Sequence, residues 1–134
     1  MILEIKKLMA RAAYVGEVSF VWQPPQDSIL IPFCRVEGGV NAVAEYEIFE
    51  GGEVEITLKI SYELIGQCSY CLADAKKRIE YETDVLYVTD KDDLDNYVYD
   101  GNMLDLTAAV NDALLFSQPK VLLCKEDCKG IKIN

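Results

Sequence analysis

Five cysteines carry most of the chemistry available to this 134-residue chain. Cys68 and Cys71 form a C-x2-C pair, and Cys124 and Cys128 form a looser C-x3-C pair near the end of the sequence. A C-x2-C turn lets two sulfurs approach one ion, and four thiolates are the ligand set that a structural, tetrahedral zinc prefers. One interpretation is therefore a zinc site made of both pairs. Cys34 has no neighbouring cysteine, and we predict it to be a small buried apolar residue.

Two other interpretations of the cysteines stay open. The protein could be a cytosolic thiol-disulfide or redox-sensing protein that uses Cys68 and Cys71. Such a pair usually lies at a helix N-terminus in a βαβ unit; here alternating patterns flank it, although "LADAKK" could form a helical turn. In the other interpretation the cysteines only pack inside an interaction domain. The two pairs are also further apart than the about 15–20 residues of compact zinc motifs, so the fold would have to return the chain end to the first pair.

Residues for catalysis are sparse. The chain has no histidine, which excludes Ser-His-Asp triads, Cys-His pairs and histidine metal ligands. It also has neither the glycine-rich loop of a P-loop protein nor the dinucleotide-binding fingerprint. The carboxylates fall on expected strand faces or in an acidic loop, where solvation explains them. We therefore expect no enzymatic activity.

The elements that position the cysteines are predicted to be strands. Apolar and polar side chains alternate from Val54 to Leu64, which indicates a strand with one buried and one exposed face. Gly51 and Gly52 precede it and predict a hairpin turn. Further alternating runs indicate strands at 18–22, 44–48 and 79–87. Successive strands of this kind predict an antiparallel meander.

A helix is predicted after an acidic segment, 90–102, which we interpret as a solvated connection. Apolar residues then recur with helical spacing at Leu106, Ala109, Val110, Ala113 and Leu114, with Asp105 as the N-cap and Pro119 beyond the end. The predicted fold class is α+β, an antiparallel β meander packed with a C-terminal amphipathic helix. We expect one domain over residues 1–134.

The net charge of −10 argues for a protein partner rather than bare RNA. Acidic residues concentrate between Glu80 and Asp112, and such a body repels a phosphate backbone. No apolar run approaches the about 20 residues that cross a bilayer, so we expect no membrane association. Glu4, Lys6 and Lys7 make the start a poor secretory signal, which predicts a cytoplasmic protein.

The order of these motifs resembles the YceD family, the large ribosomal RNA subunit accumulation proteins. The matching features are C-x-x-C-L at Cys68, Cys71 and Leu72, the helix from Asp105 and Leu106 to "LLFSQP", and the segment with Cys124, Cys128 and Gly130. Members carry such motifs in this order, and the resemblance covers about Val54 to Gly130.

The resemblance implies a small cytoplasmic protein that supports accumulation of large-subunit ribosomal RNA in ribosome biogenesis, with no known enzymatic activity. Its partner would be a ribosomal protein or the large-subunit ribosomal RNA. Longer members continue with a second cysteine pair, whereas this sequence ends at "IKIN". Cys124 and Cys128 are therefore the partners available to Cys68 and Cys71. Position 70 is tyrosine, where many members have arginine.

Overall fold

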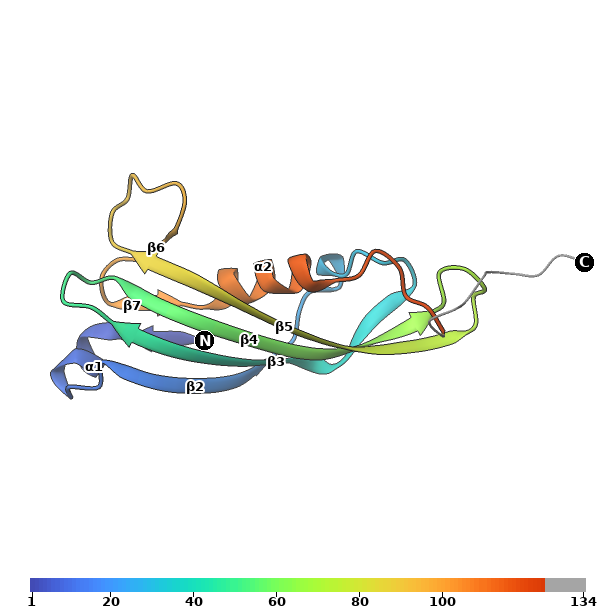
Figure 1. Ribbon diagram of the computed structural model, residues 1–134, viewed down its shortest axis with the longest axis horizontal. Helices are drawn as coiled ribbons and strands as arrows, with labels where there is room; N and C mark the ends of the chain where they lie inside the picture. Colours follow the sequence, from blue (N-terminus) through green and yellow to red (C-terminus); the bar gives the residue numbers. More distant parts are fainter. Residues whose placement is uncertain (125–134) are drawn as a thin grey trace, which may run out of the picture.

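The computed structural model describes residues 1–124. The elongated molecule is built on a long, twisted sheet with one helix along it (Figure 1). The elements are, in order, β1 (Ile2–Glu4), α1 (Ile5–Ala10), β2 (Val15–Trp22), a 3-10 turn (Gln26–Ser28), β3 (Cys34–Ile48), β4 (Val54–Gln67), β5 (Asp74–Val88), β6 (Tyr97–Val98), β7 (Met103–Asp105) and α2 (Thr107–Ser117).

The main sheet has five strands in the order β2-β3-β4-β5-β6. Neighbouring strands from β2 to β5 are antiparallel, so the predicted meander is confirmed. β6 adds a two-residue parallel pairing to the end of β5, which makes the sheet mixed. No sequence pattern indicated β6, the short helix α1, or the separate two-stranded sheet of β1 and β7.

The period-two pattern of β4 sets which face of the sheet is buried. Val54, Leu58 and Leu64 are fully buried, while residues between them, such as Glu55 and Lys59, are exposed. α2 packs against β4 and β5 on the buried face. Successive side chains of a strand point to opposite faces, so the alternation alone sends one set into the core and the other to solvent.

α2 begins at Thr107, two residues after the predicted N-cap, and Leu106 precedes it. The Asp105 carboxylate still accepts hydrogen bonds from the backbone N–H of Thr107 at 2.9 Å and from its hydroxyl at 2.7 Å. Four buried residues form the side that packs on the sheet: Ala109, Val110, Ala113 and Leu114. Phe116, however, is 78% exposed, so apolar residues are not confined to the buried side. Neither helix within residues 1–124 is long and apolar enough to span a membrane.

Three tyrosines attach the acidic segment to the body. The rings of Tyr87 and Tyr97 stack with centroids 5.1 Å apart, and the Tyr97 hydroxyl donates to the Asp112 carboxylate on α2. The Tyr99 hydroxyl donates to the carbonyl of Gly52 in the β3–β4 turn. Burial raises the pKa of Tyr87, whose hydroxyl donates to the carbonyl of Asp105 at 3.0 Å. Part of the predicted solvated connection is thus anchored as β6.

Two local features shape the sheet near the cysteines. β3 is irregular between Glu37 and Asn41, where Gly38 and Gly39 take positive φ values of 74° and 84° that favour glycine. Beyond this bulge β3 and β4 lie very close at Gly66. A Cβ on Gly66 would lie 2.3 Å from the Phe33 carbonyl oxygen. The close backbone approach therefore favours glycine at this position beside the first cysteine pair.

Candidate metal centre

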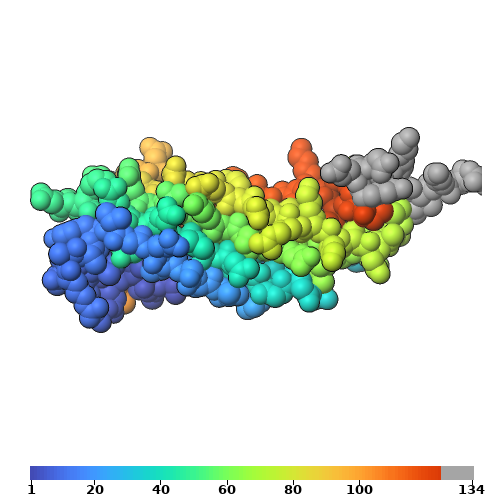
Figure 2. All heavy atoms as spheres, turned by 60° about the horizontal axis from the view of Figure 1, so that its bottom comes forward, coloured from blue at the N-terminus to red at the C-terminus, as the bar shows by residue number. Residues whose placement is uncertain are grey.

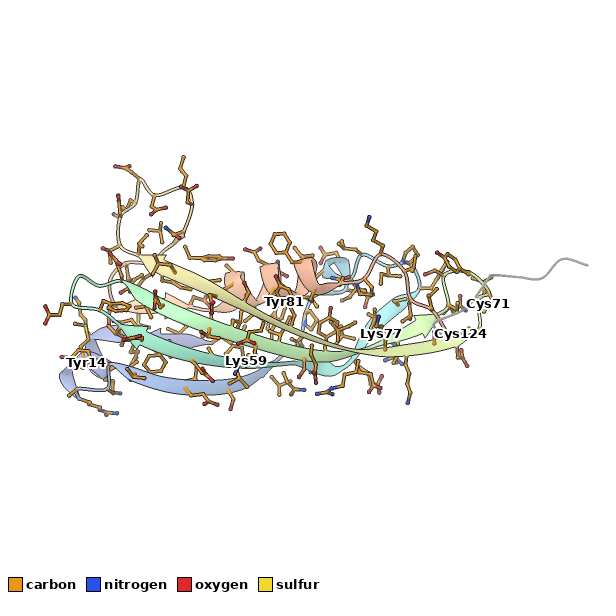
Figure 3. The ribbon with its side chains drawn as sticks, in the orientation of Figure 1. Tyr14, Lys59, Cys71, Lys77, Tyr81 and Cys124 are labelled. Carbon is orange, nitrogen blue, oxygen red and sulfur yellow. The ribbon has the colours of Figure 1, made fainter. Side chains whose placement is uncertain are left out.

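Three cysteines meet at the end of the sheet that lies furthest from α1. Cys68 and Cys71 lie in the turn between β4 and β5, and Cys124 lies in the segment after α2. The three Sγ atoms all lie within 4.8 Å of one another, and those of Cys71 and Cys124 are 3.4 Å apart. Figure 3 shows Cys71 and Cys124 together at this tip. The fold thus brings Cys124 to the first pair, as a metal site made of both segments requires.

The spacing of the sulfurs fits a tetrahedral thiolate site. Zinc–sulfur bonds of about 2.3 Å in a tetrahedron place the sulfurs about 3.8 Å apart. The separations here, 3.4 Å for one pair and no more than 4.8 Å for the others, lie around that value. A disulfide, by contrast, has sulfurs about 2.05 Å apart, so Cys71 and Cys124 are not bonded to each other. These three cysteines could hold a metal ion.

Backbone hydrogen bonds shape the turn that carries the first pair. The N–H of Cys68 donates to the carbonyl of Ala73 at 2.7 Å, and the N–H of Leu72 donates to the carbonyl of Cys68 at 3.0 Å. Leu72 has a φ of 63°, in the left-handed region. The chain then enters β5 at Asp74, so the helical turn considered for "LADAKK" does not form. The pair consequently lacks the helix N-terminus that lowers a thiol pKa in redox proteins.

Ser69 and Leu122 hold the third cysteine near the turn. The backbone N–H of Ser69 donates to the carbonyl of Leu122 at 2.7 Å, and the N–H of Leu122 donates to the Ser69 hydroxyl at 3.0 Å. Leu122 is fully buried. This reciprocal pair of bonds and the buried leucine fix the chain two residues before Cys124. Neither residue was predicted from the sequence. The available signal was a hydroxyl inside a C-x2-C turn, which does not indicate its partner.

The two remaining cysteines have different outcomes. Cys128, the fourth predicted ligand, lies outside the described residues. Cys34 is buried in β3 with 4% of its surface exposed, as predicted. Its thiol donates to the carbonyl of Pro32 at 3.4 Å, and burial raises the pKa of that thiol. Cys34 is not part of the three-cysteine cluster.

Comparison with known protein families gave a match over the second half of the chain. A family model described as "Large ribosomal RNA subunit accumulation protein YceD" matches residues 56–134. The chain belongs to the YceD family. The YceD match begins in β4 and covers the cysteine turn, β5, α2 and the segment of Cys124. No curated protein and no solved structure matched the chain.

Proposed function

We propose that this YceD-family chain is a non-enzymatic ribosome-biogenesis factor that supports accumulation of large-subunit ribosomal RNA. We further propose that Cys68, Cys71, Cys124 and Cys128 hold a structural zinc ion. Family membership supports the role in accumulation of large-subunit ribosomal RNA, and the lack of histidine and of nucleotide-binding motifs in the sequence supports the absence of an enzymatic activity. The observation that carries the zinc site is the convergence of three sulfurs from two segments 53 positions apart in sequence.

The role of the zinc would be to fasten the segment after α2 to the β4–β5 turn. Bound zinc supplies four strong bonds to thiolates and no redox chemistry. The chain's own contacts prepare the site, because the Ser69–Leu122 hydrogen bonds already bring Cys124 beside the turn. Zinc would then add a link that the unfolded chain does not have, and its binding free energy would stabilise the fold.

The proposed setting is the cytoplasm, and the proposed partner is a ribosomal protein. Ribosomal proteins are rich in lysine and arginine, and a net charge of −10 attracts such a protein while it repels RNA. Direct contact with the large-subunit ribosomal RNA is the second possibility for the partner.

Two measurements test the proposal separately. Elemental analysis of protein purified in reducing buffer, without a metal-binding tag, should give about one zinc per chain. The zinc should be lost in Cys68→Ser and kept in Cys34→Ser, since Cys34 is buried but outside the cluster. Protein without zinc would refute the metal site. In cells that lack the protein, the ratio of large- to small-subunit ribosomal RNA should fall, and an unchanged ratio would refute the biogenesis role.

The second candidate is a cytosolic thiol-disulfide or redox-sensing protein. The 3.4 Å contact between the sulfurs of Cys71 and Cys124 favours it, because a small movement would allow a disulfide. Oxidised glutathione would be the oxidant: its S–S bond would break as the protein disulfide forms, and two reduced glutathione molecules would carry away the two electrons and the two thiol protons. In this candidate function, oxidation would form a disulfide between Cys71 and Cys124. A C-x2-C redox protein would instead form one between Cys68 and Cys71. Mass spectrometry of peptides after treatment with oxidised glutathione distinguishes these bonds, and protection of all thiols by zinc would argue against redox function.

A further inference from the structure

The face of the main sheet opposite α2 is covered by no element of residues 1–124. Its side chains are exposed or half-buried, whereas the residues between them are buried in the core in β3 and β4 and half-buried in β2 and β5. The strand register aligns these side chains in four rows across β2, β3, β4 and β5: Val15–Glu47–Glu55–Leu86, Glu17–Glu45–Thr57–Asp84, Ser19–Val43–Lys59–Glu82 and Val21–Asn41–Ser61–Glu80. We call these four rows the open face. In Figure 2, residues of β2 (blue) to β5 (yellow) form a continuous surface along the molecule.

The open face is strongly acidic. Its four rows contain seven carboxylates and one lysine: Glu17, Glu45, Glu47, Glu55, Glu80, Glu82, Asp84 and Lys59. Lys59 forms an ion pair with Glu45 at 3.3 Å, and Glu80 pairs with Arg78 at 3.3 Å. Within residues 1–124 the other carboxylates of the open face have no ion pair. The face therefore keeps a large uncompensated negative charge.

Some of this charge is placed where it opposes folding. Glu17 lies directly opposite Glu45 on the neighbouring strand, and Glu47 lies directly opposite Glu55. Like charges in directly opposed cross-strand positions destabilise a sheet. Local arrangements that cost stability without a structural gain are expected at functional surfaces. A cationic partner would remove this repulsion, so the arrangement favours binding of positive charge.

A hollow lies among these charges. It has a volume of about 430 Å3, and Val43, Lys59, Ser61, Glu80 and Glu82 contribute to its lining. Figure 3 shows Lys59 on the side of the sheet away from α2. Glu45 most strongly, and then Glu82 and Glu17, raise the pKa of Lys59, so carboxylates from three strands act at this point. An apolar residue beside carboxylates suits a long cationic side chain, whose stem packs on apolar surface while its charged end reaches oxygen atoms.

We propose that the open face binds a lysine- and arginine-rich segment of a protein, with one cationic side chain in the hollow beside Val43 and Ser61. RNA does not fit this face, because its phosphates would meet seven carboxylates. The inference rests on the proposed function only for the source of the partner, a ribosomal protein. The proposed surface uses only part of the acidic stretch from Glu80 to Asp112: Glu80, Glu82 and Asp84 belong to the open face, whereas Asp112 accepts a hydrogen bond from Tyr97.

A titration with a labelled peptide of alternating lysine and threonine tests the proposal on the full-length protein. The face variant combines Glu17→Gln, Glu47→Gln and Glu55→Gln, none of which breaks an ion pair within residues 1–124. It should raise the Kd about tenfold, because each removed carboxylate weakens an exposed ion pair with the peptide. The same variant should melt no earlier than the wild type, since the opposed Glu47–Glu55 and Glu17–Glu45 repulsions are relieved.

A matched control carries the same change of charge away from the face. Glu50→Gln, Asp92→Asn and Asp95→Asn alter exposed loop residues and should change the Kd less than twofold. Ser61→Tyr should weaken binding by filling the hollow without changing charge, and tyrosine suits an outward strand position. Equal weakening by the face and control variants would overturn the proposal, because net charge alone would explain it.

Two further results separate this inference from the proposed function. Tighter binding of single-stranded RNA than of the cationic peptide would overturn the protein-binding face. A normal ribosomal RNA ratio in cells that lack the protein would instead refute the biogenesis role and leave the peptide result standing. If the biogenesis role holds, the face variant should keep its zinc but fail to restore the ratio. Full restoration would overturn the face as the partner surface.

Discussion

Replacing Cys68 and Cys34 separately by alanine compares two buried cysteines of which only one belongs to the cluster. Cys68 has none of its surface exposed and Cys34 has 4% exposed. Each substitution removes one buried sulfur, at a packing cost of about 1 kcal/mol in the free energy of unfolding. Any additional loss in Cys68→Ala must come from the cluster, because Cys34 is outside it.

The additional loss can be worked out from metal linkage. A ligand that binds only the folded state raises the free energy of unfolding. The increase is about 2.7 kcal/mol when the free ligand concentration is 100 times the Kd, and about 4.1 kcal/mol when it is 1,000 times the Kd. For a chain of 134 residues, 1 kcal/mol corresponds to about 3–4 °C in Tm. A chelator should therefore lower the Tm of the wild type and of Cys34→Ala by about 10 °C. It should leave the Tm of Cys68→Ala nearly unchanged, because that variant holds no zinc.

The assay is thermal unfolding followed by circular dichroism in reducing buffer, with and without the chelator. Two results would refute the reasoning. If the chelator leaves the wild type unchanged, no metal stabilises the fold. If the chelator lowers the Tm of Cys68→Ala as much as that of the wild type, the stabilising metal does not bind to this cluster.

Three further predictions concern the supports of the site. Leu122→Ala should lower the free energy of unfolding by about 3 kcal/mol and weaken zinc binding, since a fully buried side chain next to the cysteine turn is lost. Urea unfolding measures the change in stability, and titration with a zinc indicator measures the change in zinc affinity. An unchanged zinc affinity would contradict the supporting role of Leu122. Gly66→Ala should lower the free energy of unfolding by about 1–3 kcal/mol, because its Cβ would lie 2.3 Å from the Phe33 carbonyl oxygen. An unchanged midpoint of urea unfolding would contradict this. Hydrogen bonds from Thr107 lower the pKa of Asp105 in the folded protein. The stabilising effect of the carboxylate is therefore present above the unfolded pKa and is lost as the pH falls through the lower, folded pKa. Asp105→Asn should lose less stability than the wild type below about pH 4, and equal slopes of unfolding free energy against pH in the two proteins would contradict this.

The strands that could be predicted are those with a long local pattern. Residues 54–64 alternate over eleven positions, and the structure extends this strand only slightly, to Val54–Gln67. The missed strands are too short for any period to appear: β1 and β7 have three residues each and β6 has two. Their strand geometry comes from pairing partners that are distant in the sequence, such as Leu3 with Leu104.

For the acidic residues, too, some properties could be taken from the sequence and others depend on the fold. Their number, and hence an electrostatic preference for a cationic partner, could be taken from the sequence. Their arrangement could not, because Glu17, Glu45 and Asp84 come from three strands and share one row only through the sheet register. The sequence therefore indicated a segment between Glu80 and Asp112, whereas the fold gathers much of the acidic charge on one face.

The sequence by itself determined the alternating strands, the helix before Pro119 and which thiols are candidate ligands, because periodicity and residue chemistry are local properties. The tertiary structure decided that Cys68, Cys71 and Cys124 meet. That meeting depends on α2 packing along β4 and β5 and on the bonds between Ser69 and Leu122. Such contacts join residues 53 positions apart, and their geometry exists only once the core has formed.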